Sequence, residues 1–197
     1  MIRRLLVLSI VALLATPAWA QDKSAPDKPV SGKPAPAPAD SAGTKAPRLV
    51  ITMEKGGDIT LELFPKDAPK HVENFVSLAR KGFYDGQRVH RVEPNFVVQF
   101  GDPQSKTLPM DHPRMGTGDP GYKIKAEFNS RKFERGVLGM ARSQDPDSGG
   151  SQVYIMLGPA PFLNGKYTAF GQVTKGMDVV DKIRVGDRIT SIKVVNP

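Results

Sequence analysis

The chain has 197 residues, a formal net charge of +8 and no cysteine. Without cysteine it can form no disulfide, no thiolate metal site and no thiol nucleophile. A basic chain can attract anionic partners, but these lysines and arginines are scattered, with no basic run and no interleaved aromatic residues. Composition and charge therefore argue against nucleic-acid binding.

The first 20 residues, MIRRLLVLSIVALLATPAWA, are typical of a secretory signal peptide. Arg3 and Arg4 form the charged start, an apolar run follows, and Ala18-Trp19-Ala20 fits a cleavage site. The apolar run is shorter than the roughly 20 residues that span a bilayer, so we expect cleavage rather than stable membrane insertion. The mature protein is then expected to be periplasmic or secreted.

Residues 21–47 consist mainly of Pro, Ala, Ser, Lys and Asp, with Val30 as the one large aliphatic residue. Such a composition cannot offset the entropy lost on ordering, so we expect a disordered linker. Residues 48–197 remain, and roughly 150 residues suffice for one domain that buries about 70% of its unfolded surface. We therefore expect a single folded domain over 48–197.

Most of this domain shows the two-residue alternation of β-strands. Ile59, Leu61 and Leu63, for example, alternate with polar residues directly after a Gly-Gly-Asp turn. Many short strands separated by turn signals favour a sandwich or a barrel. The expected strands are 49–53, 59–63, 89–92, 97–100, 122–128, 137–141, 153–157, 168–173 and 189–195.

Two segments have helical periodicity instead. In DAPKHVENFVSLARKG, residues 67–82, apolar side chains recur at positions i, i+3, i+4 and i+7, beginning at Val72. Pro69 suits the first helical position and Gly82 suits the position just after the end. A second, weaker pattern lies in residues 175–187. Both apolar faces need a surface to cover, and the open ends of a small barrel would provide one.

Three apparent motifs are rejected on their context. GTGDPG, residues 116–121, matches a dinucleotide fingerprint, but no helix pattern follows it. DPDSGG resembles the start of a calcium loop, but Met156 stands where the bidentate glutamate is required. The three histidines, His71, His90 and His112, are not accompanied by a nucleophile-elbow motif. Nucleotide binding, calcium binding and serine-hydrolase chemistry are therefore disfavoured.

The stretch VHRVEPNFVVQFGDP, residues 89–103, predicts a hairpin around Glu93-Pro94-Asn95. Alternation places Arg91 on one face of the first strand, while Val97 and Gln99 share a face of the second. An arginine and a glutamine are thus set among apolar neighbours. Taken alone, such an arginine is most often a solvated strand residue, so the pattern raises a question that the wider motifs have to answer.

Together with that stretch, RGVLGMARSQDPDSGGSQVYIML and FLNGKYTAFGQV resemble the cyclophilin family of peptidyl-prolyl isomerases, especially its bacterial branch. The resemblance extends from about residue 49 to 195. It implies a mainly β fold, a closed eight-stranded antiparallel barrel capped by two α-helices, with 122–128 in a long loop. It also implies a substrate groove on the outside of the barrel wall, faced by Arg91, Val97 and Gln99, while Val98 and Phe100 face the core.

The resemblance implies a peptidyl-prolyl cis-trans isomerase that needs no metal or cofactor. Three catalytic residues are expected, Arg91, Phe96 and Gln99. The expected substrate-binding residues are Val97, Met140, Ala141, Arg142, Gln152, Tyr154, Phe162, Leu163 and Tyr167.

Several positions depart from common members of that family. Val97 replaces a methionine, Arg142 an asparagine, and Tyr154 a phenylalanine, whose added hydroxyl would need water or a partner. Phe100 stands in place of a common glycine, and Phe162 replaces the tryptophan of members that bind cyclosporin tightly. These departures concern the depth and polarity of the groove.

Two functions stay open at this point. The first is an active exported isomerase, expected to be a monomer, which assists the folding of exported proteins. The second is a chaperone or scaffold that binds proline-containing segments with little turnover. The set Arg91, Phe96 and Gln99 favours the first, and the substitutions at 97, 142 and 154 keep the second open. Proline-containing polypeptides are the expected partners in both.

Overall fold

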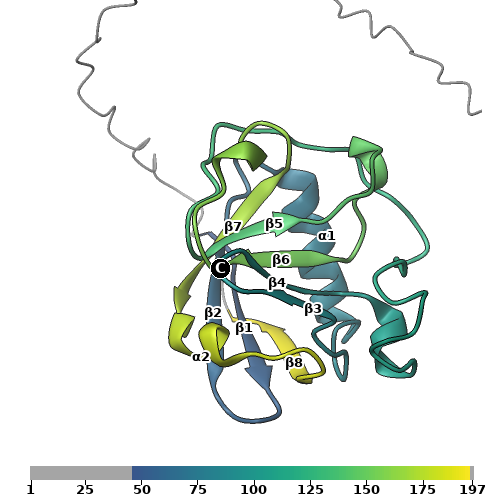
Figure 1. The fold of residues 1–197 in the computed structure, drawn as a ribbon. Helices are drawn as coiled ribbons and strands as arrows, with labels where there is room; N and C mark the ends of the chain where they lie inside the picture. Colours follow the sequence, from purple (N-terminus) through teal and green to yellow (C-terminus); the bar gives the residue numbers. More distant parts are fainter. Residues whose placement is uncertain (1–45, 196–197) are drawn as a thin grey trace, which may run out of the picture. The chain divides into compact units, whose positions relative to one another are not determined.

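The structure, a computed structural model, describes residues 46–195. The expected signal peptide and all but the end of the expected linker lie outside this range. Within it the chain forms eight strands and two α-helices (Figure 1). Their bounds are β1 (Arg48–Met53), β2 (Asp58–Leu63), α1 (Pro69–Arg80), β3 (Arg91–Glu93), β4 (Val97–Phe100), β5 (Val137–Met140), β6 (Val153–Met156), β7 (Ala169–Lys175), α2 (Met177–Lys182) and β8 (Ile189–Val194). Among the described residues, no helix has the length and apolar character needed to cross a membrane.

All eight strands belong to one curled antiparallel sheet, in the order β3-β4-β6-β5-β7-β2-β1-β8. The closed barrel expected from the sequence is not confirmed, because no strand ladder joins the two edge strands β3 and β8. The segment before β3 does approach the first residue of β8 and the residues before it. Residues 86–89 and 186–189 exchange four backbone hydrogen bonds of 2.8 Å, which we call the seam.

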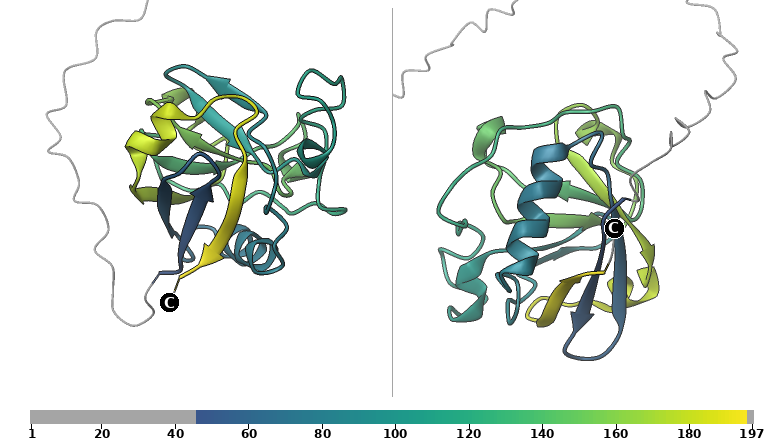
Figure 2. Two further views of the ribbon diagram at one scale, coloured as in Figure 1. Left: turned by 90° about the horizontal axis from the view of Figure 1, so that it is seen from below. Right: turned by 180° about the vertical axis from the view of Figure 1, so that it is seen from behind.

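The core lies on the inner face of the sheet, and strand alternation fills it. Leu49, Ile51 and Met53 of β1 are buried and alternate with more exposed residues, as the sequence predicted. Helix α1 buries Phe75 at its centre and packs against the sheet through β7 and β8, and it covers one side of the sheet in the right-hand view of Figure 2. The helix begins at Pro69 and its end is followed by Gly82 in the left-handed region, as predicted.

The second helix is shorter than its sequence pattern. Helix α2 follows Gly176, whose φ of 87° suits glycine, and ends where Ile183 becomes extended. Val180 is buried and the helix contacts β2. It therefore covers less of the sheet than the predicted span of 175–187 would.

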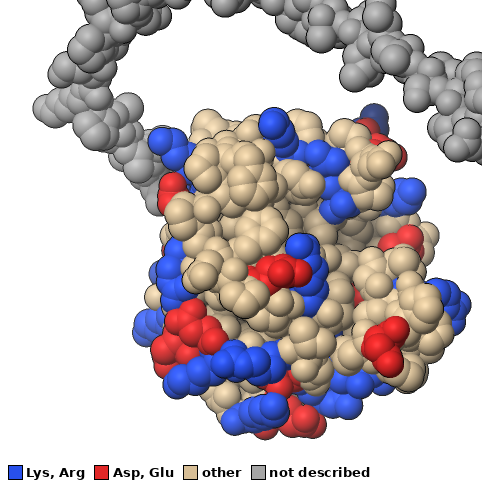
Figure 3. All heavy atoms as spheres, in the orientation of Figure 1, with Lys and Arg blue, Asp and Glu red and all other residues tan. Residues whose placement is uncertain are grey.

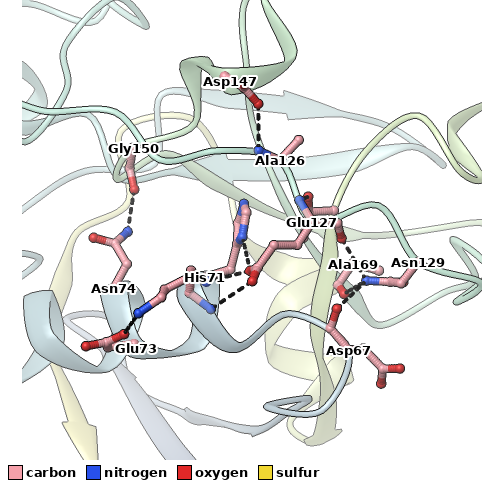
Figure 4. A network of polar contacts seen from close by, with 12 residues as sticks. Asp67, His71, Glu73, Asn74, Ala126, Glu127, Asn129, Asp147, Gly150 and Ala169 are labelled. Carbon is pink, nitrogen blue, oxygen red and sulfur yellow. Dashed lines mark hydrogen bonds and ion pairs between the residues drawn. The ribbon is translucent and has the colours of Figure 1, made fainter.

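The strand predicted at 122–128 is wrong, and the loop implied by the family resemblance is confirmed. Only Ile124 makes a β-bridge, to Gly149. The next backbone N–H groups donate to side chains instead, Ala126 to Asp147 and Glu127 to the Thr168 hydroxyl, each at 2.9 Å. Figure 4 shows this segment held by polar side chains. Alternation alone misled here because the segment has no neighbouring strand to pair with.

Candidate active site

Arg91 and Gln99 lie side by side on adjacent strands. The hairpin of β3 and β4 pairs Arg91 directly with Gln99, and β4 in turn pairs Gln99 with Tyr154 of β6. Asn95 in the turn has a φ of 60°, which lets the chain reverse over so few residues. Arg91 Nη1 donates to Oε1 of Gln99 at 3.2 Å. The side chain of Arg91 is 45% exposed, so its remaining donors face solvent.

A chain of amide side chains continues from this pair. Nε2 of Gln99 donates to Oε1 of Gln152 at 3.0 Å. Nε2 of Gln152 donates to two backbone carbonyls, of Gly116 at 2.9 Å and of Gly118 at 2.8 Å. Arg91 is thus braced by neutral groups, and the nearest carboxylate, Glu93, lies 3.5 Å from its Nε with both side chains about half exposed. Such an exposed ion pair is weak, so the positive charge of Arg91 stays available.

A second apolar cluster, separate from the main core, lies beside Arg91 on the outer face of the sheet. We call the following buried residues the outer cluster: Val97, Phe133, Val137, Tyr154, Met156, Ala160, Leu163 and Ala169. Phe96, Ala141 and Tyr167 are partly buried against it. The rings of Phe96 and Phe162 are 5.8 Å apart, and the guanidinium of Arg91 lies 5.8 Å from the Phe96 ring. Phe162 is 62% exposed and forms an open wall.

The sequence did not single out Phe133, Val137, Met156, Ala160 or Ala169. Phe133 lies in a loop between charged residues, and its backbone N–H donates to Oδ1 of the Asn164 side chain at 2.9 Å rather than to a strand. Its carbonyl accepts from Ala160. A lone aromatic residue between two charges was the one signal that could have marked this segment as buried.

Tyr154 forms the floor of the outer cluster, and its hydroxyl is buried. In the described part of the protein this hydroxyl has no protein hydrogen-bond partner. Burial raises the pKa of Tyr154, which stays neutral. The ring lies against Gly139 of β5, where any Cβ atom would overlap it. A glycine at 139 therefore makes room for the ring and hydroxyl of Tyr154.

Arg142 is held by the protein rather than left free for a ligand. Its guanidinium lies 4.3 Å from the centre of the Tyr167 ring. Nη1 donates to the carbonyls of Ser143 and Gln144, and Nη2 donates to that of Lys166. Arg142 thus joins two loops at the rim of the groove. The remaining Nε is buried without a partner among the described residues.

Met140 does not join the other predicted site residues. It shares a face of β5 with Leu138, is 3% exposed and packs in the main core with Val98. The following residue, Ala141, is on the outer side. The resemblance placed both residues at the groove, but only one of the two side chains can share the face of the outer cluster because successive residues alternate.

His90 precedes Arg91 in the chain and, like Arg91, lines a pocket of about 390 Å³. Gln99 and the 110–116 loop form the rest of this pocket. Both ring nitrogens are buried and have no hydrogen-bond partner in the described structure. Burial lowers the pKa of His90, against the opposing influence of Asp102 and Gln152, so the ring is neutral near pH 7. Among the described residues, no group of three or more acidic, histidine or cysteine side chains is placed to hold a metal.

Comparison with known proteins agrees with this geometry. Residues 48–196 match the model of the cyclophilin type peptidyl-prolyl cis-trans isomerase family. A probable peptidyl-prolyl cis-trans isomerase of Brucella suis is 47% identical over 151 residues, which cover 75% of this chain and 77% of that one. Peptidyl-prolyl cis-trans isomerase B of Bacillus subtilis is 43% identical over 144 residues, covering 72% and 94%.

Solved structures show the same fold. A cyclophilin type peptidyl-prolyl cis-trans isomerase of Cryptosporidium parvum superimposes with a TM-score of 0.66 at 27% identity, covering 77% of this chain and 99% of that one. A second structure of that protein, in the presence of the dipeptide Ala-Pro, gives a TM-score of 0.64.

Fold and site together define a mainly β protein of antiparallel strands with an arginine beside an apolar cluster on the outer face of the sheet. The chain belongs to the cyclophilin-type peptidyl-prolyl cis-trans isomerase family. It is an isomerase of X–Pro peptide bonds.

Proposed function

We propose that the groove between Arg91 and the outer cluster binds the proline of the substrate and lowers the barrier to rotation. An X–Pro bond isomerises slowly, over about 10–100 s, because rotation breaks the amide resonance. As the bond twists, the proline nitrogen regains a lone pair. Catalysis then requires a site that binds the twisted amide better than either planar form, and no bond has to break.

Each part of the groove has a place in this reaction. The outer cluster, with Val97, Tyr154 and Leu163, offers an apolar surface for the proline ring, and Phe96, Phe162 and Tyr167 line its rim. Arg91 supplies a donor to the developing lone pair, since a guanidinium is always charged and offers several N–H groups in a rigid fork. Gln99 holds the guanidinium in place.

The backbone of the substrate is expected to contact residues that neighbour Arg91, Gln99 and the outer cluster. Ala141 and Gln152 lie at the edge of the groove, and a second pocket of about 390 Å³ lies between Gln99, Gln152 and the loop at 116–119. Arg142 shapes this edge through its contacts with Tyr167 and Lys166. The dipeptide Ala-Pro used with the Cryptosporidium parvum relative supports proline-containing peptides as ligands of this chain. We leave Met140 out of the site because it lies in the core.

We further propose that the protein acts on exported polypeptides. The proposal rests on the signal-peptide pattern of residues 1–20, which precedes the domain. Fractionation of cells that produce the full chain would test it. Processed protein in the periplasm or medium supports the proposal, and unprocessed protein in the cytosol refutes it.

The single observation that carries the catalytic proposal is the braced Arg91 beside the outer cluster. A protease-coupled assay with a short proline peptide tests it. Arg91→Ala is expected to lower kcat/KM on the order of 10²-fold, the effect of removing a transition-state donor. Arg91→Lys is expected to be poor as well, since a point charge cannot replace the fork.

Arg91 is half exposed and belongs to a three-residue edge strand, so its loss should change the free energy of unfolding by less than about 0.5 kcal/mol. Wild-type turnover by Arg91→Ala would refute the assignment. Intact peptide binding with little turnover by the wild-type protein would favour the binding-module alternative for this chain.

A further inference from the structure

Asp102 is a fully buried carboxylate at the end of β4, close to the groove but outside it. Its Oδ1 accepts from the backbone N–H of Gln104 at 2.7 Å. Its Oδ2 accepts from the N–H groups of Gly116 at 2.6 Å and Gly118 at 3.3 Å. One carboxylate therefore ties the loop at 116–118 to the end of the strand that carries Gln99.

The same two glycines bind Gln152 through their carbonyls. Gly116 and Gly118 each use the N–H group toward Asp102 and the C=O group toward the amide nitrogen of Gln152. A substitution at Asp102 that shifts these two peptide units therefore also shifts the carbonyl oxygens to which Gln152 donates. The close approach also depends on glycine, because a Cβ atom at position 118 would overlap the carboxylate.

The direction of every hydrogen bond from this loop to Arg91 is fixed. A carbonyl only accepts, so Gln152 must turn its NH₂ group to the loop and its oxygen to Gln99. Gln99 must then turn its NH₂ group to Gln152 and its oxygen to Arg91, which can only donate. A flipped amide at either glutamine would leave two donors or two acceptors facing each other.

We infer that Asp102 is a positioning residue for Arg91. By holding the peptide units of Gly116 and Gly118 it orients Gln152, which orients the oxygen of Gln99 on which Arg91 rests. The inference depends on the proposed role of Arg91. If Arg91 is loosely held, its side chain has to be ordered when the transition state forms, and this ordering raises the barrier. A substitution at Asp102 therefore lowers turnover more than peptide binding.

A double-mutant cycle on turnover tests the inference. Asp102→Asn keeps the size of the side chain but replaces one accepting oxygen by an NH₂ group that faces backbone donors. We expect it to lower kcat about tenfold with KM changed less than about twofold, the scale on which an outer hydrogen-bond partner acts. Gln152→Leu removes the side chain that links the loop at 116–118 to Gln99 and should lower kcat similarly.

The decisive measurement is the double variant Asp102→Asn/Gln152→Leu. If Asp102 acts through Gln152, its substitution changes kcat less than about twofold once Gln152 is gone. If the two losses multiply instead, Asp102 acts by another route and the inference is wrong. Arg91→Ala is measured in parallel, and full activity of that variant refutes the catalytic proposal itself. If Arg91→Ala is inactive but the kcat losses of Asp102→Asn and Gln152→Leu multiply, only the role of Asp102 is refuted.

Glu127→Gln is the matched control for a general loss of stability. Glu127 is another carboxylate that accepts two backbone N–H groups, but it lies at helix α1 and outside the groove. It should lower the unfolding midpoint and leave kcat unchanged. A similar fall in kcat for Glu127→Gln would show that turnover follows stability and would overturn the inference.

A second variant covers the case in which Asp102→Asn does not fold. Gly118→Ala leaves the carboxylate in the chain but displaces it, because the added methyl group occupies its place. The same dependence on Gln152 is expected for this variant. Side-chain amide NMR signals of Gln99 and Gln152 should also broaden or shift, and unchanged signals would contradict the inference.

Discussion

Arg91 is held by a neutral amide rather than by a carboxylate, and this choice bears on its chemistry. A paired carboxylate would neutralise much of the positive charge of the guanidinium. The neutral Gln99 oxygen instead holds one N–H group, so the positive charge can still interact with the substrate. The proposed reaction also transfers no proton. The groups that do titrate near neutral pH should therefore leave turnover unaffected.

We predict that kcat/KM is nearly flat from about pH 6 to 8. His90 is the histidine nearest to Arg91, and burial lowers its pKa below the ordinary value of 6.5, so it stays neutral through most of this window. The pH profile of the protease-coupled assay, corrected for the protease, measures this. The variant His90→Gln should give the same profile, and a limb near pH 6.5 that disappears in this variant would implicate His90 in the chemistry.

Phe162 sets the open wall of the groove and offers no hydrogen-bond donor. Its ring is exposed and stacks loosely on Phe96. Since tryptophan at this position accompanies tight cyclosporin binding in the family, we predict weak inhibition of this protein by cyclosporin. Phe162→Trp should tighten binding by about 1–2 kcal/mol, one hydrogen bond plus added contact, as measured by calorimetry.

Activity of Phe162→Trp on a short peptide should change little. Phe128→Trp is the control, because Phe128 is also an exposed phenylalanine but does not belong to the outer cluster or its rim. Tight binding by the wild-type protein, or no gain from the tryptophan at 162, would show that this side chain does not contact the ligand.

At the level of elements, helix α1 is capped by a residue from far along the chain. Its N-cap residue, Ala68, has no side chain that can accept, and Glu127 accepts from the backbone N–H groups of Lys70 at 3.0 Å and His71 at 2.9 Å (Figure 4). It also accepts from Nδ1 of His71 at 2.6 Å. This carboxylate therefore joins α1 to the loop that the sequence misassigned as a strand.

We predict that Glu127→Gln lowers the free energy of unfolding by about 1–2 kcal/mol, the usual value of a helix cap. An amide has one accepting oxygen, so one helix N–H group would face an NH₂ group. Urea unfolding at pH 7 measures the loss. A midpoint equal to that of the wild type would show that the loop does not cap the helix.

The same pair should make stability depend on pH. Burial lowers the pKa of His71, against the pull of the Glu127 carboxylate; for Glu127, burial acts to raise the pKa but the hydrogen bonds from Lys70 and His71 outweigh it and lower it. Both folded pKa values lie below their unfolded ones. The unfolded state therefore takes up protons first, and stability falls as the pH drops below about 6.5 and further through the carboxylate range.

His71→Asn is the variant that separates the two groups, since its Nδ2 can still donate to Glu127 but does not titrate. Its unfolding free energy should change less than that of the wild type between about pH 7 and 5.5. An equal change in both proteins would mean that His71 is not the group responsible.

At the level of the whole molecule, the seam between residues 86–89 and 186–189 brings the two edges of the sheet together. Gly86 donates to Ile189 and Val89 donates to Asp187, with the reverse bonds from Ile189 and Gly186. We predict that these four amide hydrogens exchange as slowly as those in the middle of the sheet. Hydrogen exchange followed by NMR measures this, and fast exchange at all four would show that the sheet opens there.

The charges on one face of the molecule are mixed in sign. On the face shown in Figure 3, basic and acidic side chains are interspersed around a broad uncharged area, and no continuous basic stripe crosses it. On this face the charged side chains are thus dispersed as solvated surface groups.

The sequence by itself determined the strands of the hairpin, the face on which Arg91 and Gln99 lie, and the start of α1. These follow from periodicity, a short turn and a proline, all of which act within a few residues. The family motif takes Met140 and Ala141 together, whereas the structure packs Ala141 against the outer cluster and Met140 in the core.

Only the tertiary structure decided which distant groups meet. Phe133 and Gly139 around Tyr154, Glu127 at the start of α1, and the glycine carbonyls that hold Gln152 come from loops or opposite strands. The physical reason is that alternation reports which face a side chain takes, not which partner it finds there. A buried hydrogen bond depends on the positions of two segments that can be far apart in the sequence. Loop sequences have no periodicity from which either partner could be predicted.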